Sequence, residues 1–178
     1  VFLFDEATVK GENLLISKNG FHALLVLKGA RFNFNHCNFM GYGAAQSPAI
    51  GIRNYYDAPI IGYDIDEGII YNSVISGNLE TEIVLDTIQN FAGQLNFDFQ
   101  NCFIESEIEY EDPFYQNCIW RIGFDNFLNP SFNDISLYDF GFPNSSPLQG
   151  SGFGTAVFTD LLGNFRNNPP DIGAIEQN

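Results

Sequence analysis

The sequence predicts an all-β chain folded as a right-handed parallel β-helix, in which short strands stack turn upon turn into a solenoid. Three observations predict this fold: a composition with 19 Phe, 8 Tyr and 17 Gly among 178 residues, a residue tetrad that recurs, and a second kind of strand between the tetrads. Aromatic residues favour strands, whereas Gly disfavours helix interiors. The length is that of one domain.

The tetrad consists of a polar residue, a small residue, a variable residue and a large apolar residue. Its four copies are His36-Cys37-Asn38-Phe39, Asn72-Ser73-Val74-Ile75, Asn101-Cys102-Phe103-Ile104 and Asn117-Cys118-Ile119-Trp120. Upstream of two copies, the pairs Phe32/Phe34 and Phe97/Phe99 alternate with polar residues, which is the strand period of two. The tetrads therefore predict repeated strands.

The second kind of strand lies between the tetrads, at residues 22–27, 48–53 and 81–86. The small tetrad residues are 36, 29 and 16 positions apart, so loops of variable length separate the strands. A parallel solenoid stacks like strands on like strands and lets only the turns grow. A propeller would need hairpins, and Lys18-Asn19-Gly20 is the nearest approach to a hairpin turn.

The small tetrad residues Cys37, Ser73, Cys102 and Cys118 are predicted to stack as a buried column in the solenoid core. Cysteine in such a column behaves as a small hydrophobe. The alternative, a catalytic thiol, needs a neighbouring His, and neither histidine recurs with the cysteines. Three cysteines without metal-like spacing allow at most one disulfide bridge.

The charge is strongly acidic, with 7 Lys and Arg against 22 Asp and Glu and a formal net charge of −15. Such a surface repels nucleic acid and anionic headgroups. The longest apolar runs, such as Ala23 to Leu27, fall far short of a membrane span. We therefore expect no nucleic-acid partner and no insertion into a membrane.

Candidate catalytic and glycan-binding residues gather after the strand at 48–53. Arg53, followed by Asp57, is the most lyase-like pairing, although a strand end followed by a solvated loop has the same pattern. Tyr55, Tyr56 and Tyr63 could stack on sugar rings of a polysaccharide, the alternative being half-buried rings with hydroxyls at the surface.

Two acidic clusters raise the question of calcium. Asp64, Asp66 and Glu67 precede Gly68, but they do not continue as an EF-hand loop. The alternating glutamates from Glu105 to Glu111 have the pattern of a solvated strand face. Calcium at either cluster, with Asp64, Asp66 and Glu67 as the candidate ligands, is the one cofactor hypothesis; otherwise no cofactor is expected.

From about Gly93 onward the order of motifs resembles the C-terminal region of the choice-of-anchor Q family. The matching stretches are Phe99-Gln100-Asn101-Cys102-Phe103-Ile104, Asn117-Cys118-Ile119, Asn129-Pro130-Ser131-Phe132, Ser136-Leu137, Ser145-Ser146-Pro147-Leu148, residues 159–166 and Pro170-Asp171-Ile172-Gly173-Ala174-Ile175-Glu176. The family usually has an aromatic residue where Ile175 stands. The resemblance implies a secreted or cell-surface protein with a pectate-lyase-like solenoid fold.

We expect solenoid rungs over residues 1–125 and a loop-rich cap over 126–178 that covers the open end of the last rung. Asp160, Arg166, Asp171 and Glu176 are predicted to pin this cap by ion pairs. Further rungs of the same protein are expected upstream of Val1.

Two classes of function follow. The first is a non-catalytic secreted or surface module, structural or adhesive, that presents a carbohydrate-binding face. The alternative is a polysaccharide lyase or glycoside hydrolase acting on the side of the solenoid. A fold of this kind supports both, so the site must decide.

Overall fold

The computed structural model describes residues 2–5, 7–43, 46–55, 61–88, 92–110 and 113–177. Within them the chain is all-β, with one short 3-10 helix, η1 (Ile135–Leu137). The strands are β1 (Phe2–Asp5), β2 (Thr8–Glu12), β3 (Leu15–Ile16), β4 (Leu24–Leu27), β5 (Arg31–Asn35), β6 (Asn38–Met40), β7 (Ile50–Arg53), β8 (Ile65–Tyr71), β9 (Val74–Ser76), β10 (Ile83–Asp86), β11 (Leu95–Gln100), β12 (Phe103–Ser106), β13 (Tyr115–Gln116) and β14 (Ile119–Ile122).

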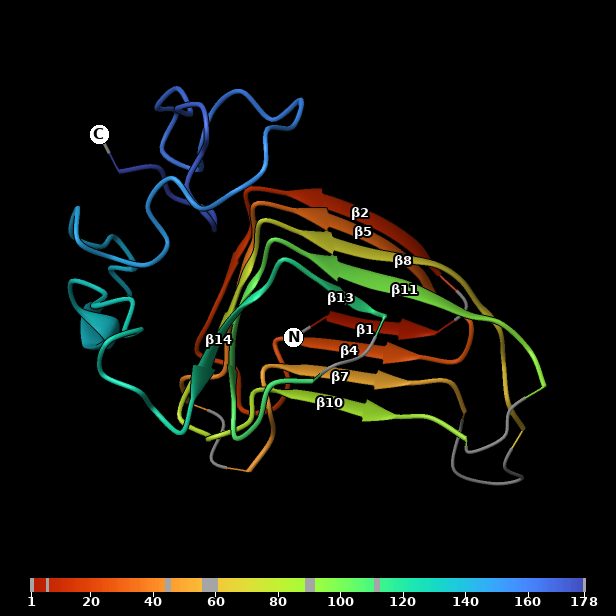
Figure 1. The fold of residues 1–178 in the computed structure, drawn as a ribbon. Coiled ribbons are helices and arrows are strands. Elements are labelled where there is room, and N and C mark those ends of the chain that lie inside the picture. Colours follow the sequence, from red (N-terminus) through yellow and green to blue (C-terminus); the bar gives the residue numbers. More distant parts are fainter. Residues whose placement is uncertain are drawn as a thin grey trace.

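The strands form three parallel sheets around one interior (Figure 1). Sheet A has the order β1-β4-β7-β10, sheet B the order β13-β11-β8-β5-β2, and sheet C the order β14-β12-β9-β6-β3. From β1 to β12 the chain visits sheets A, B and C in turn, so each circuit adds one strand to each sheet. The predicted all-β class with parallel stacking is thus confirmed, and the arrangement is compatible with a parallel β-helix.

The sequence predicted two kinds of strand, but the structure has three. The third arises because a sharp bend at the first residue of each tetrad separates a sheet B strand from a sheet C strand. The polar residues His36, Asn72, Asn101 and Asn117 have φ angles of 52°, 44°, 51° and 52°. This left-handed conformation is tolerated by Asn, whose short polar side chain bonds locally. The alternating phenylalanines therefore belong to sheet B, and the last two residues of each tetrad belong to sheet C.

The interior is filled by inward side chains from all three sheets, among them Phe32 and Phe34 of β5 and Phe97 and Phe99 of β11. Gly68 of β8 lies between two of these rings in the same column. A Cβ atom there would come within 2.4 Å of Phe32 Cζ and 2.8 Å of Phe97 Cβ. Glycine is required at this position because the neighbouring rings occupy its space.

The column of small tetrad residues lies at the bend between sheets B and C. Cys37, Ser73 and Cys102 are fully buried, Cys118 is half-buried, and the three thiols are unbridged. Burial raises the pKa of the Cys37 thiol to about 12. Such a thiol stays protonated near neutral pH, which favours the structural interpretation over a nucleophile.

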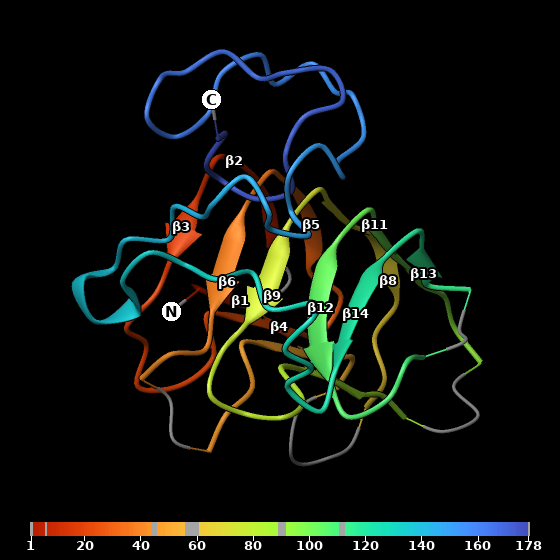
Figure 2. The same cartoon turned by 60° about the vertical axis from the view of Figure 1, so that its left-hand side comes forward.

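The C-terminal segment takes a different course from the expected cap. It does not cover the end of the last rung; it runs back along the outer face of sheet C (Figure 2). Phe140, Phe142, Leu148 and Ile172 form a second buried cluster there with residues that sheet C turns outward: Leu15, Met40, Val74, Phe103 and Ile119. The physical reason is that sheet C also turns large apolar side chains outward, and these need a cover.

The end of the last rung is covered instead by aromatic rings. Tyr110 stacks on Tyr115 with ring centroids 5.9 Å apart, and lies 5.6 Å from Trp120. Among the described residues the chain passes from β12 in sheet C to β13 in sheet B without adding a strand to sheet A. Tyr110 and Tyr115 lie in and after this connection. Residues expected to form rungs therefore cover part of their own end.

Candidate functional site

A polar cluster lies where strands β7 and β10 end, on the outer face of sheet A. Arg53 and Asp86 are register partners in these neighbouring strands. Their ion pair has an Arg53 Nε to Asp86 Oδ2 distance of 3.0 Å, and the two side chains are 35% and 42% exposed. The pair is therefore accessible from solvent and carries no net charge.

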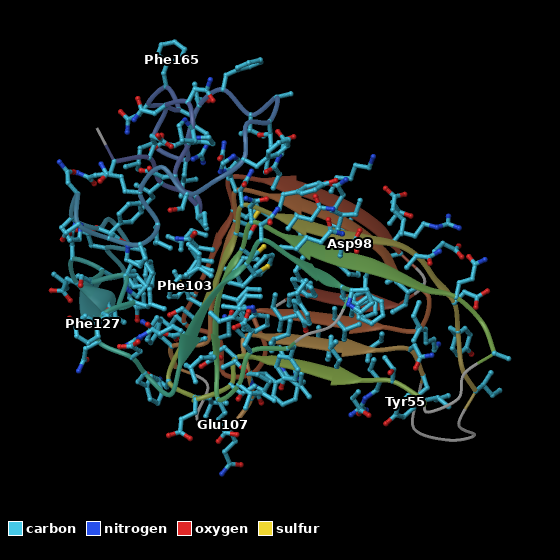
Figure 3. All side chains as sticks on the ribbon, in the orientation of Figure 1. Tyr55, Asp98, Phe103, Glu107, Phe127 and Phe165 are labelled. Carbon is cyan, nitrogen blue, oxygen red and sulfur yellow. The ribbon has the colours of Figure 1, made fainter. Side chains whose placement is uncertain are left out.

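Tyr55 completes this cluster. Its hydroxyl donates to both carboxylate oxygens of Asp86, at 3.0 Å to Oδ1 and 2.9 Å to Oδ2. The Arg53 guanidinium carbon lies 5.1 Å from the centre of the Tyr55 ring, within the range of a cation–π contact. Figure 3 shows Tyr55 beyond the arrowheads of sheet A. The cluster thus presents an aromatic ring beside a fixed array of donors and acceptors.

A hollow of about 190 Å³ adjoins the cluster, lined by His22, Leu25, Gly51, Ile52, Arg53, Val84 and Asp86. Gly51 lies in the outward column between Leu25 of β4 and Val84 of β10. A Cβ atom on Gly51 would lie 3.0 Å from Leu25 Cδ1 and 3.2 Å from His22 Nε2. The hollow therefore exists because this position has no side chain.

His22 contributes an acceptor to the hollow. Its Nδ1 atom lies 2.6 Å from the Pro48 carbonyl oxygen, which can only accept, so Nδ1 carries the proton. Burial lowers the pKa of His22, opposed by the bond to Pro48 and assisted by the nearby charge of Arg53. The imidazole is therefore neutral at neutral pH, and its unprotonated Nε2 faces Gly51.

The hollow combines apolar walls, one neutral imidazole, and a guanidinium that is paired with a carboxylate. These groups suit hydrogen bonding to hydroxyls beside an apolar ring face. A glycoside hydrolase needs two carboxylates across the scissile bond, and among the described residues Asp86 is the one carboxylate that lines the hollow. The geometry thus supports binding more directly than hydrolysis.

Of the residues predicted from the sequence, the structure brings Arg53 and Tyr55 together. Tyr63 lies at the same corner, where its backbone N–H donates to the Asn54 carbonyl and Lys28 Nζ lies 5.7 Å from the centre of its ring. Asp57 and Tyr56 lie outside the described residues.

The calcium candidates are not brought together as a site. Asp66 forms an ion pair with Arg31, Asp64 accepts a hydrogen bond from the Gln94 backbone at 2.8 Å, and Glu67 is exposed. In the part of the chain that the structure describes, no group of three His, Cys, Asp or Glu side chains could hold a metal ion.

The four charged residues expected to pin the C-terminal segment do lie together. Glu176 accepts from Arg166 Nη1 at 3.2 Å and from the Asp171 backbone at 3.0 Å, and its own backbone donates to Asp160 Oδ2 at 2.9 Å. The three carboxylates are at most 4% exposed. Arg166 Nη2 also donates to Asn13 Oδ1, so this network fastens the segment to the first described circuit.

Comparisons with known protein families, with curated proteins and with solved structures find no match to this chain. Among the described residues, no helix is long and apolar enough to span a membrane.

Asp86 and His22 are the site residues that sequence reasoning missed. Asp86 is the last residue of a recognised strand, in the place that Arg53 occupies in the strand before it, so aligning the repeats could have found the pair. His22 was expected to begin the strand at 22–27, but in the structure it precedes β4, so strand register gave no signal for it.

Proposed function

We propose that this chain is part of a right-handed parallel β-helix protein of the choice-of-anchor Q type, secreted or displayed at the cell surface, and that it binds a polysaccharide without cleaving it. The observation that carries the binding proposal is that Arg53 and Asp86 line the hollow above Gly51 as an ion pair, with the Tyr55 hydroxyl bonded to Asp86 beside it. Parallel stacking of the strands and the order of C-terminal motifs support the proposed fold family.

The shape of the site supports an extended polymer. A hollow of about 190 Å³ is smaller than the sites that enclose drug-sized ligands. It suits one sugar ring of a chain whose other rings lie along the outer face of sheet A. The sides of a solenoid offer such long, shallow surfaces.

Charge favours a neutral polysaccharide. Asp86 offsets the positive charge of Arg53 at the hollow, and the chain as a whole carries −15. A uronate-rich polymer would meet repulsion at most of this surface. We therefore expect neutral glycans to be retained more strongly than polygalacturonate or alginate.

The alternative function is a lyase, and one observation favours it. The neutral His22 imidazole, with Nε2 free of a proton, faces the hollow beside Arg53. A base next to a cation is the arrangement that β-elimination requires. Against it, Arg53 is already paired with Asp86, which reduces its ability to neutralise a substrate carboxylate.

The test is affinity electrophoresis and calorimetry with a panel of neutral and acidic polysaccharides, with and without calcium, scored in parallel for released unsaturated and reducing ends. Retention without release is expected. Asp86→Asn and Gly51→Ala should each weaken binding about tenfold, because one removes a charged hydrogen-bond acceptor and the other fills the hollow.

Glu67→Gln is the matched control for Asp86→Asn, since it removes one exposed carboxylate on sheet B. If Asp86→Asn and Glu67→Gln weaken polysaccharide retention equally, binding takes place elsewhere and the proposed site is refuted. Release of unsaturated ends that is lost in His22→Gln would replace binding with the lyase function.

A further inference from the structure

Sheet A has an open edge at the end of the coil. β10 pairs with β7 on one side, and no described strand pairs with its other side, because the last circuit adds strands only to sheets B and C. The backbone N–H and C=O groups of an unpaired edge are available to a further strand.

A pocket of about 410 Å³ lies beside this edge. Its walls include Ile83, Val84 and Leu85 of β10, Thr81 before it, and the rings of Tyr110 and Tyr115. The walls are mainly apolar. Tyr110 stacks on Tyr115, and both rings contact Trp120, which holds the aromatic wall in place. The edge therefore offers both backbone groups and a preformed place for an apolar side chain.

Two glutamates, Glu107 and Glu109, adjoin residues of the pocket wall and are called its rim below. Glu107 and Glu109 are exposed, the backbone of Glu107 donates to Thr81 Oγ1 at 3.1 Å, and Glu109 directly precedes Tyr110. The sequence contains no Lys or Arg between Arg53 and Arg121. The negative charges of Glu107 and Glu109 beside the pocket therefore complement a positively charged partner. Figure 3 shows Glu107 pointing away from the ribbon, near the start of β10.

We propose that β10 and this pocket form a docking site for an extended basic peptide segment of another protein. The segment adds to sheet A as a parallel strand beside β10. Because side chains alternate along a strand, its inward apolar residue fills the pocket while flanking lysines or arginines approach Glu107 and Glu109. A second copy of this chain is disfavoured as the occupant, since each copy carries a charge of −15.

The test uses the intact chain and a fluorescein-labelled peptide of alternating lysine and valine, measured by fluorescence polarisation at low and high salt. We expect saturable binding that weakens with salt and slows amide hydrogen exchange in β10. Two control peptides replace lysine by glutamate, which reverses the charge, or valine by proline, which removes backbone donors. Both should bind at least tenfold more weakly.

Two variants separate charge from fold. Glu107→Gln with Glu109→Gln should weaken binding of the lysine–valine peptide roughly tenfold, at about threefold per rim charge. Glu12→Gln with Glu67→Gln removes the same charge from exposed positions of sheet B and should leave the affinity unchanged. Tyr110→Ala, which removes one wall of the pocket, should abolish saturable binding.

Equal effects of the two double variants, or equal binding of the glutamate peptide, would overturn the proposal. So would self-association of the chain through β10 that the peptide cannot displace. The result is independent of the glycan proposal, because Gly51→Ala should leave peptide binding intact and the rim variant should leave polysaccharide retention intact.

Discussion

Arg53 and Asp86 stand side by side at the ends of neighbouring strands, with 3.0 Å between Nε and Oδ2, although 32 residues of chain separate them. The pairing follows from the parallel register, which places the last residue of β7 opposite the last residue of β10. In a stacked fold, residues at the same position of successive repeats thus become neighbours across the sheet.

Replacing Asp86 by Asn should have little effect on stability, since ion pairs this exposed contribute less than about 1 kcal/mol. Urea denaturation should therefore give a nearly unchanged free energy of unfolding for Asp86→Asn. A loss of several kcal/mol would mean that the pair supports the fold, and Asp86→Asn could then not be used to probe binding.

Glu82 should make stability depend on pH. Its carboxyl is fully buried, and desolvation raises its pKa from 4.5 to about 7, opposed by hydrogen bonds from the backbone N–H groups of Leu79 and Ala49. A group whose pKa is higher in the folded state than in the unfolded state stabilises the fold when protonated. This stabilisation is complete below the unfolded-state pKa and is lost as pH rises through the folded-state pKa.

The free energy of unfolding of the wild-type protein should therefore fall by up to about 3 kcal/mol, relative to that of Glu82→Gln, as pH rises from about 4.5 to about 7. Because wild type and Glu82→Gln share all other carboxylates, the difference between them reports the titration of Glu82 alone. Chemical denaturation across this range measures it, with the exposed Glu80→Gln as the control that should track the wild type. Parallel curves for wild type and Glu82→Gln would show that Glu82 does not titrate there.

Asn117 should tolerate glycine but not valine. Its φ of 52° lies in the left-handed region, its side chain is exposed, and valine is strongly disfavoured there. Asn117→Val should cost about 1–2 kcal/mol, whereas Asn117→Gly should stay within about 0.5 kcal/mol of wild type. Equal losses of unfolding free energy in Asn117→Val and Asn117→Gly, measured by urea denaturation, would indicate that stability depends on the Asn117 side chain and not on the backbone bend.

Glu176 should be essential to the C-terminal cover. Glu176→Ala would leave the buried Arg166 guanidinium without its paired carboxylate, which costs about 3–5 kcal/mol. We expect a lower melting temperature and rapid proteolysis within residues 126–177. Glu107→Ala, at an exposed position, is the matched control and should change the free energy of unfolding by no more than about 0.5 kcal/mol. Unchanged protease resistance in Glu176→Ala would contradict the role of this network.

Part of the candidate site could be recognised from local pattern. Arg53 and Tyr55 stood out because they follow a strand and begin a loop rich in tyrosine. Asp86 and His22 did not, because each depends on which strands become neighbours in sheet A. The same limit applies to Asp64, Asp66 and Glu67, which are close in sequence but differ in their surroundings: Asp64 accepts from the Gln94 backbone, Asp66 pairs with Arg31, and Glu67 is exposed.

The sequence by itself determined the all-β class, the parallel repeats and the burial of three of the four small tetrad residues, since these depend on local alternation and on bends that recur with Asn or His. Only the tertiary structure decided that Arg53 pairs with Asp86, that the C-terminal segment covers sheet C, and that no described strand pairs with the outer side of β10. The physical reason is that local preferences fix where strands and bends form, whereas the partners across a sheet depend on loop lengths and on which apolar face remains to be buried.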